Sequence, residues 1–233
     1  MYARQSTPAI VSCYTAHRLD RARYIVVEGP IGVGKTTLVE ALAQRFNARP
    51  VYEIVEENPF LPLFYQDRGK YAFQTQLFFL LSRFKQQQEL FQQDLFNQVT
   101  VSDYLFSKDR IFASVNLDPS SFALYERVFE LLGPRTVKPD LVIYLQSRLD
   151  VLLGRIKKRG RDFEKKFDAG YLEQVCTAYN EYFFRYQDTP LLVINTSDVD
   201  YVASEADLDN IVQIIRKTRH GTHYYIPLAS GAS

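Results

Sequence analysis

The sequence is poor in cysteine, and its two cysteines, Cys13 and Cys176, have neither the spacing of a metal site nor that of a redox motif. Two isolated thiols of this kind indicate a reducing compartment. We therefore expect no disulfide framework, which excludes a small disulfide-stabilised domain. The predicted location is the cytoplasm.

The sequence also lacks a dominant charge and a long apolar run. Its 28 Lys and Arg residues nearly balance 27 Asp and Glu residues, for a net charge of +1. No long-range field would draw such a chain to nucleic acid or to anionic lipid, so positive charge must act locally. The densest apolar stretches, such as Leu77–Leu81, fall far below the roughly 18 residues of a membrane span. We expect a soluble protein without nucleic-acid or membrane partners.

The length of 233 residues suits one large α/β domain. Residues 1–22 contain three arginines with Ser and Thr, and Asp20 is their single acid. This composition fits a poorly ordered leader or, as the alternative, an organelle transit peptide; the leader is favoured because no helical apolar period is sustained there. We assign residues 23–218 to one domain and 219–233 to an irregular C-terminal tail.

Short β-branched runs alternate with helical stretches along the chain. Tyr24–Glu28 is predicted as a strand that ends in a Gly-rich turn, and Thr37–Phe46 has apolar residues at helical spacing. Further strands are predicted at Val51–Val55, Val99–Ser102, Leu141–Leu145 and Leu191–Ile194, with the longest helix at Tyr71–Gln93. Strands separated by helices require crossover connections, so we expect an α/β fold with a five-stranded parallel sheet flanked by helices.

A glycine-rich segment between the first strand and the first helix matches the P-loop pattern G-x4-G-K-[ST]. Its glycines let backbone amides turn toward phosphate oxygens, and the helix N-terminus adds a partial positive charge. Lys35 would bridge the β- and γ-phosphates, and the Thr36 hydroxyl would hold Mg²⁺. The expected ATP-binding residues here are Gly29, Pro30, Ile31, Gly32, Val33, Gly34, Lys35, Thr36 and Thr37.

A P-loop is shared by kinases, switch GTPases and motor ATPases, so the loop alone does not define the activity. Guanine specificity in GTPases usually comes with an Asn-Lys-x-Asp motif after a strand. Here the segment Val137-Lys-Pro-Asp140 lacks the Asn and precedes a predicted strand. We interpret it as a turn, which disfavours a GTPase.

Three arginines at a predicted helix end favour phosphoryl transfer. Arg155, Arg159 and Arg161 recur at i, i+4 and i+6 around Gly160. Such cations can follow the charge that spreads over the equatorial oxygens of a transferring phosphoryl group; a solvated helix face is the alternative. We expect Arg155 and Arg159 to act in catalysis and Arg159 and Arg161 to contact ATP. The segment Arg161–Asp168 is predicted to close as a short Arg-rich lid.

The acceptor of a phosphoryl group must lose a proton, yet all three histidines lie in the terminal extensions. The base should therefore be a carboxylate. Glu53, Glu56 and Glu57 cluster at the end of the second predicted strand, where open parallel sheets place their ligands, and Asp103 follows the third strand. Four acids exceed the need of one proton transfer, so some of them are structural, linked to Mg²⁺ or exposed.

Several further motifs follow the P-loop in order. They are Glu53-Ile-Val-Glu-Glu-Asn-Pro-Phe60, Tyr65, Phe73-Gln-Thr-Gln76, Ser82-Arg83, Ile111-Phe-Ala113, Ile143-Tyr-Leu-Gln146 and Arg155-Ile-Lys-Lys-Arg-Gly-Arg161. With them the chain, from about Tyr24 to Lys217, resembles the deoxynucleoside kinases. That family includes bacterial deoxyadenosine and deoxyguanosine kinases and animal deoxycytidine, deoxyguanosine and mitochondrial thymidine kinases.

The resemblance implies roles for three residues around the nucleoside. Glu53 would be the general base at the 5′-hydroxyl, which selects one of the three glutamates. Tyr65 would contact the 3′-hydroxyl, and Gln76, eleven residues later, would pair with the nucleobase. Gln74 is excluded because two residues along a helix rotate a side chain by roughly 200°.

The resemblance extends to three more residues. Arg83 would lie near the nucleobase, and its position about two helical turns after Gln76 puts it on the same face. Phe112 would cover the nucleobase, and Glu164 would reach the 3′-hydroxyl from the lid.

The sequence departs from the family pattern after the third strand. Many members have an acid followed by an Arg that contacts phosphate and the catalytic Glu, whereas this chain reads Ser102-Asp103-Tyr104. Asp103 would remain in the substrate site, where it would bind Mg²⁺ through water or hold the P-loop. Arg110, further along the segment, is a candidate substitute for the missing Arg.

The sequence thus predicts a P-loop kinase that uses Mg²⁺ and ATP to phosphorylate the 5′-hydroxyl of a deoxynucleoside in nucleotide salvage. A purine preference is expected because the Glu-Glu-Asn-Pro-Phe and Thr-Gln pattern resembles the bacterial purine-directed branch, and relatives imply a homodimer. Two alternatives stay open: a nucleoside monophosphate kinase such as a thymidylate kinase, and a non-catalytic P-loop regulatory switch.

Overall fold

The computed structural model describes residues 23–92, 99–161, 168–198 and 204–226. These ranges contain a six-stranded parallel sheet of order β2-β3-β1-β4-β5-β6. The strands are β1 (Tyr24–Glu28), β2 (Arg49–Val51), β3 (Thr100–Ser102), β4 (Leu141–Gln146), β5 (Leu191–Asn195) and β6 (Thr222–Tyr225). Because β1 is central, the loop that follows it lies in the middle of the sheet's carboxyl edge, where parallel sheets bind ligands.

The sixth strand corrects the prediction of five. β6 pairs in parallel with β5 and lies in the stretch expected to be an irregular tail. Its first three residues are exposed, so no buried apolar run marks it in the sequence. It extends the sheet by pairing with the backbone groups that an edge strand presents. Regular structure therefore continues past the predicted domain end at residue 218.

The second strand is also shorter and begins earlier than predicted. It spans Arg49–Val51 where the sequence suggested Val51–Val55. Because β2 ends at Val51, Glu53 lies in the loop that follows the strand and not in the strand itself. Its side chain can point across the carboxyl edge without the alternation that a strand would impose.

Alternate residues of the central strands face opposite sides of the sheet. Ile25 and Val27 of β1 belong to one apolar layer, and Tyr24 and Val26 belong to the other. All four are buried. A parallel sheet covered on both faces needs apolar side chains on both, which explains why β1 is a continuous apolar run.

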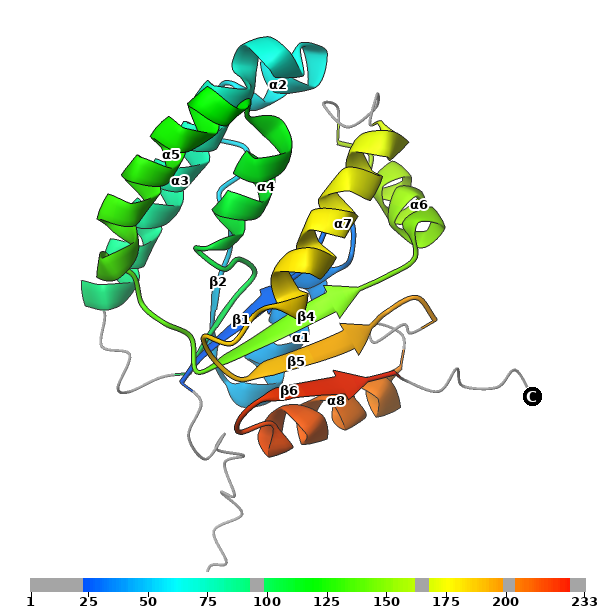
Figure 1. Cartoon of the computed structure of the whole chain (residues 1–233). Helices are drawn as coiled ribbons and strands as arrows, with labels where there is room; N and C mark the ends of the chain where they lie inside the picture. The colour runs from blue at the N-terminus through cyan, green and yellow to red at the C-terminus, as the bar shows by residue number, and fades with distance from the viewer. Residues whose placement is uncertain (1–22, 93–98, 162–167, 199–203, 227–233) are drawn as a thin grey trace, which may run out of the picture.

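Helices cover both faces of the sheet (Figure 1). The first layer contains α1 (Lys35–Phe46), α6 (Leu149–Arg159) and α8 (Glu205–Lys217). The second contains α3 (Arg68–Gln92), α4 (Lys108–Asn116) and α7 (Ala169–Phe184), and α2 (Leu61–Gln66) precedes α3. Among the described helices, none has the length and the apolar character that crossing a membrane requires.

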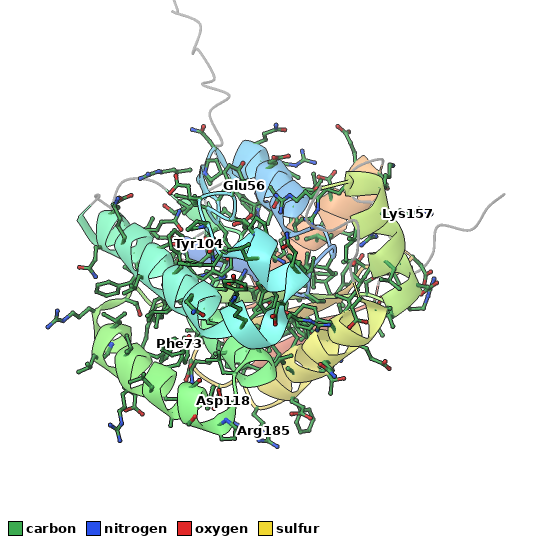
Figure 2. The ribbon with its side chains drawn as sticks, turned by 90° about the horizontal axis from the view of Figure 1, so that it is seen from above. Glu56, Phe73, Tyr104, Asp118, Lys157 and Arg185 are labelled. Carbon is green, nitrogen blue, oxygen red and sulfur yellow. The ribbon has the colours of Figure 1, made fainter. Side chains whose placement is uncertain are left out.

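One more helix, α5 (Pro119–Leu132), packs against α3 and α4. The contact is a separate apolar cluster of Leu80, Phe106, Ala113 and Tyr125. Asp118 caps the start of α5 and lies at the periphery of the molecule in Figure 2, whereas Tyr104 lies inside. This cluster supports α3 and α4, which carry much of the site described below.

The glycine-rich loop is pressed against β4 and α6. Gly29, Gly32 and Gly34 have φ values of 153°, 83° and 103°. A Cβ atom on Gly29 would lie 2.5 Å from the Leu145 carbonyl oxygen, and one on Gly32 would lie 2.7 Å from Ile156 Cγ1. Positive φ and close approach both require glycine. The loop is therefore held against the helix that carries Arg155 and Arg159.

We expect Gly32→Ala to destabilise the fold by about 1–3 kcal/mol, because alanine is strained at this φ and its methyl group would collide with Ile156. Gly154→Ala in α6 is the control, since nothing lies within 4 Å of the added carbon. That change should stabilise the helix by about 0.5–1 kcal/mol. Urea unfolding measures both effects, and a Gly32→Ala protein as stable as wild type would contradict the packing argument.

Candidate active site

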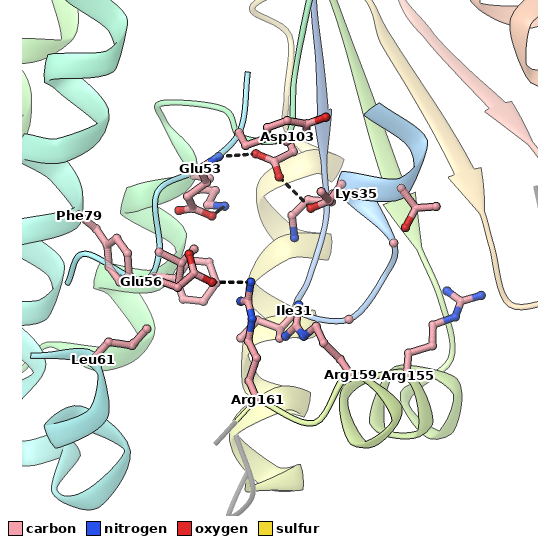
Figure 3. Close-up of a pocket in the computed structure, with 18 of the residues that line it drawn as sticks. Ile31, Lys35, Glu53, Glu56, Leu61, Phe79, Asp103, Arg155, Arg159 and Arg161 are labelled. Atoms are coloured by element: carbon pink, nitrogen blue, oxygen red, sulfur yellow. Dashed lines mark hydrogen bonds and ion pairs between the residues drawn. The ribbon is translucent and has the colours of Figure 1, made fainter. Parts of the chain in front are cut away.

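One cleft of about 1140 Å³ opens at the carboxyl edge of the sheet (Figure 3). The glycine-rich loop and α6 line one end, and α2, α3 and α4 line the other. The sequence-predicted residues in this lining are Ile31, Gly32, Gly34, Lys35, Thr36, Thr37, Glu53, Tyr65, Gln76, Arg83, Asp103, Phe112, Arg155, Arg159 and Arg161. Gly29, Pro30 and Val33 belong to the loop but lie outside the lining, and Val33 is in the apolar core.

Lys35 is the central cation of the loop end of the cleft. Its Nζ donates to the carbonyl oxygens of Gly29, at 2.8 Å, and Pro30, at 3.2 Å. Burial, followed by the charge of Lys108, lowers the pKa of Lys35 to about 8 although carboxylates lie nearby. A further negative charge would stabilise the ammonium form. The residue that precedes α1 is Gly34, which has no side chain to cap the helix, so the helix N-terminus can also face an anion there.

Asp103 joins the two halves of the cleft. Its Oδ2 accepts a 2.8 Å hydrogen bond from the Thr36 hydroxyl, and its Oδ1 accepts a 2.7 Å bond from the Glu53 backbone N–H. Its own backbone N–H donates to the Val51 carbonyl oxygen at 3.0 Å. The carboxylate, at the end of β3, thus fixes the loop after β2 relative to the start of α1 (Figure 3).

Glu53 is another acid that lines the cleft. Its Oε1 accepts from Arg83 Nε at 2.9 Å, and its Oε2 accepts from Lys108 Nζ at 2.7 Å. Burial alone would raise the pKa of Glu53, but the charges of Arg83 and Lys108 outweigh burial and hold the pKa well below its usual range. The carboxylate is therefore ionised and oriented by two cations.

The other two glutamates of the cluster have different surroundings. Glu56 is exposed at the rim and forms a 2.8 Å ion pair with Arg161. Glu57 is exposed and does not line the cleft. Of the three, Glu53 alone is both shielded and paired with cations inside the cleft.

The three arginines gather along one side of the cleft (Figure 3). The helix end is where the sequence predicted it, with Gly160 in the left-handed conformation after Arg159. Arg155 donates to the carbonyl oxygens of Val33 and Thr196, each at 3.0 Å. Arg155 therefore ties the glycine-rich loop to the end of β5, and Arg159 and Arg161 also line the cleft.

The far end of the cleft carries polar groups set among apolar walls. Gln76 is buried and lines the cleft, while Gln74 is exposed, so the two amides lie on different faces of α3 as helical spacing requires. Among the described residues, neither Gln76 Oε1 nor the Thr75 hydroxyl has a hydrogen-bond partner. Unpaired buried polar atoms are costly unless a ligand satisfies them. Tyr65 and Phe112 form part of the surrounding wall.

Arg83 connects this end to Glu53. It is buried on the same face of α3 as Gln76 and lines the cleft, as its spacing predicted. Its guanidinium pairs with Glu53 and with Asp109 of α4, a fully buried carboxylate. The Arg83 guanidinium also lies 4.9 Å from the centre of the Phe79 ring. Asp109 was not expected from the sequence.

Two further charged residues escaped the sequence analysis. Lys108 lines the cleft and is buried beside Glu53. Glu28, the last residue of β1, is fully buried and accepts bonds from the backbone N–H groups of Gly29 and Leu105, both at 2.8 Å, and from the Tyr179 hydroxyl at 3.0 Å. The position of Glu28, an acid at the end of an apolar strand directly before the P-loop, was the one feature of the sequence that could have marked it as functional. No local feature of the sequence marks Lys108.

Arg110 does not replace the Arg that is missing after Asp103. Its side chain is exposed and pairs with Glu126 of α5 at 2.6 and 2.9 Å. Lys108, two residues earlier, is the cation of this segment that reaches Glu53. Glu164 and most of the predicted lid lie outside the described residues, so the role expected for Glu164 stays a prediction.

Comparison with known proteins decides the family. Residues 25–219 match the family model described as deoxynucleoside kinase. The chain belongs to the deoxynucleoside kinase family. The kinase is 37% identical to a deoxyguanosine kinase of Bacillus subtilis, over 85% of this chain and 99% of that one. It is 33% identical to a deoxyadenosine kinase of Lactobacillus acidophilus, over 84% of this chain and 96% of that one.

A solved structure of a deoxyadenosine kinase from M. mycoides with bound dCTP shares the fold of this kinase. Its TM-score is 0.73 at 26% identity, over 83% of this chain and 99% of that one. The predicted family, the α/β fold and the assignment as a phosphotransferase of deoxynucleoside salvage are thus confirmed. The alternatives of a thymidylate-kinase-like enzyme and a regulatory switch lose their support.

The buried ion pairs of the kinase should be fragile to the loss of one partner. Arg83→Met would leave Asp109 and Glu53 without their shared cation, which we expect to cost about 3–5 kcal/mol. Arg45→Met is the control, because Arg45 pairs with Asp209 at the surface and such pairs contribute about 0–1 kcal/mol. Denaturant unfolding compares the two proteins. A similar loss of unfolding free energy in both variants would show that burial does not determine how much an ion pair contributes to stability.

Proposed function

We propose that this kinase transfers the γ-phosphate of ATP to the 5′-hydroxyl of a deoxynucleoside and prefers deoxyguanosine or deoxyadenosine. The observation that carries the proposal is one continuous cleft with a P-loop at one end and the Glu53 carboxylate on its wall. At its other end lies the Gln76 amide oxygen, which has no hydrogen-bond partner among the described residues. A phosphate donor and a nucleoside would meet in such a cleft without solvent between them.

On the donor side, Lys35 and the N-terminus of α1 would bind the β- and γ-phosphates, and Arg159 and Arg161 would contact them from the opening. These groups are cationic or carry a positive helix-end dipole, and they face one end of the cleft. Charge on the transferring phosphoryl group would thus meet preorganised positive charge. Arg155 would act mainly by holding the loop, because it donates to the carbonyl oxygens of Val33 and Thr196 and to the Thr196 hydroxyl.

Thr36 and Asp103 would hold Mg²⁺. Their hydroxyl and carboxylate oxygens are 2.8 Å apart beside the P-loop, and Mg²⁺ prefers such oxygen donors, with phosphates and water completing its shell. The described residues contain no group of three or more acids, histidines or cysteines that could hold a metal alone, so the phosphates would complete the site. When bound, the ion supplies positive charge to the triphosphate.

On the acceptor side, Glu53 would take the proton of the 5′-hydroxyl as the hydroxyl oxygen attacks the γ-phosphorus. The carboxylate is ionised, so it can accept and orient the hydroxyl hydrogen. Asp103 ties the Glu53 backbone to Thr36 of the P-loop. The base would therefore stand beside the phosphate that it helps to transfer.

A purine would suit the polar groups at the far end of the cleft. The Gln76 amide offers a donor and an acceptor, which can pair with the N6 and N7 atoms of adenine, and a nearby arginine such as Arg83 suits the O6 and N7 atoms of guanine. Tyr65 and Phe112 would pack around the sugar and the base. Relatives named deoxyguanosine and deoxyadenosine kinases support the same preference. The homodimer and the cytoplasmic location remain predictions from the sequence.

An acceptor screen tests the proposed reaction. With ATP and Mg²⁺, deoxyguanosine or deoxyadenosine should give a kcat/KM at least about tenfold above those of deoxycytidine and thymidine, because one base edge matched by hydrogen bonds contributes about 1–3 kcal/mol. The 5′-monophosphates of the same nucleosides are the control and should not be phosphorylated. A higher kcat/KM with a pyrimidine would overturn the purine preference, and turnover of monophosphates would overturn the proposed acceptor.

Glu53→Gln tests the base. The variant should lose about 10²–10⁴ in kcat and retain ATP binding, because the amide cannot take the proton but occupies the same space. Glu57→Gln, at an exposed position outside the cleft, should match wild type. Rapid-mixing kinetics with saturating ATP and nucleoside measures the step. An unchanged kcat in Glu53→Gln would exclude Glu53 as the base.

A further inference from the structure

The resemblance to the family led us to expect an arginine directly after Asp103, at the end of β3, but this chain has no cation there. Tyr104 follows Asp103 directly, is fully buried and does not line the cleft. A side chain in that orientation cannot reach the phosphate end. Four residues later, at the first residue of α4, Lys108 does line the cleft.

Lys108 is almost completely enclosed, with 2% of the residue exposed. Its Nζ lies 2.7 Å from Glu53 Oε2 and 3.9 Å from Glu28 Oε1. Burying an ammonium group is costly, and two carboxylates offset that cost here. An apolar side chain of the same size could fill this space without the desolvation cost. A lysine here therefore indicates that its charge has a role of its own.

The backbone around Lys108 is held as firmly as its side chain. The Lys108 N–H donates to the Leu105 carbonyl oxygen at 3.0 Å, and the Leu105 N–H donates to Glu28 Oε2 at 2.8 Å. Glu28 also accepts from the Gly29 N–H at the start of the P-loop. One buried carboxylate therefore connects the P-loop with the turn that carries Lys108.

Lys108 and Lys35 both line the cleft. Asp103 holds their neighbours together, because it accepts from the hydroxyl of Thr36, next to Lys35, and from the backbone N–H of Glu53, the partner of Lys108. Two neighbouring cations that face one cleft repel each other, and an anion between them would relieve that repulsion. The γ-phosphate of a nucleotide on the P-loop is such an anion.

We propose that Lys108 is a catalytic residue that contacts the transferring phosphoryl group opposite Lys35 while it remains bonded to Glu53. An ammonium has three donors, so one can stay on the carboxylate while the others meet phosphoryl oxygens. The inference rests on the proposed function: the nucleoside O5′–P bond forms, the bond from the γ-phosphorus to the bridging oxygen breaks, ADP leaves with that oxygen, and the hydroxyl proton passes to Glu53.

The first test separates contact with phosphate from support of Glu53. In Lys108→Met, affinity for a non-hydrolysable ATP analogue should fall about tenfold while affinity for ADP changes less than about twofold, because the lost partner is a charged γ-phosphate oxygen. kcat should fall about 10²–10³, as when one donor to a developing charge is removed. Lys108→Arg should recover part of the kcat. Equal losses for the ATP analogue and ADP, or no loss, would overturn the proposal.

Arg110→Met is the matched control, because Arg110 lies on the same helix but points outward to Glu126; it should behave as wild type. Lys108→Gln keeps a donor for Glu53 without the charge, and it provides the same comparison should the Met variant fail to fold. Circular dichroism melting identifies a folded variant.

The second test is a double-mutant cycle with Glu53→Gln. If Lys108 touches the phosphoryl group, Lys108→Met should lower the residual kcat of Glu53→Gln by a further factor of about ten or more. No further loss would mean that Lys108 acts only by positioning Glu53, and the proposal would be wrong. A wild-type protein that phosphorylates no deoxynucleoside would instead refute the proposed function, so the two failures are distinguishable.

Discussion

The site depends on the Asp103 carboxylate, which bonds the Thr36 hydroxyl with one oxygen and the Glu53 backbone N–H with the other. Thr36 begins the helix after the P-loop, whereas Glu53 lies in the loop after β2, and β3 stands between β1 and β2 in the sheet. A short, mostly buried carboxylate with both oxygens occupied allows little relative movement. The distance between the phosphate end and Glu53 is therefore set by the sheet itself, not by flexible side chains.

Around this link the kinase buries several charges of alternating sign. Glu28 and Glu53 face Lys108, and Arg83 lies between Glu53 and Asp109. Such pairs add little net stability because each ion loses its hydration, so their arrangement is better explained by what they orient. Arg83 and Lys108, the two cations that pair with Glu53, also line the cleft, so positive charge is in place before a ligand binds.

Much of this was accessible from the sequence, and the misses have physical causes. The P-loop is local. Helical spacing showed that Gln74 and Gln76 cannot share a face, and the resemblance to the family chose Gln76. The same spacing put Arg83 on the face of Gln76. β6 escaped because an exposed edge strand has no apolar pattern, and its pairing partner β5 lies earlier in the chain. Arg110 was a plausible substitute by position, but the direction of α4 turns it toward α5 and turns Lys108 inward.

The sequence by itself determined the features that depend on neighbours along the chain: the phosphate loop, the amphipathic helices, the end of α6 at Gly160, and a family whose motifs occur in order. The tertiary structure alone decided which charges meet. Glu28 and Lys108, or Arg83 and Glu53, are brought together by strand order and helix packing, and no local spacing encodes those contacts. The strength of an ion pair depends on the distance between the charges and on how deeply they are buried. Both quantities are defined only after the sheet has formed.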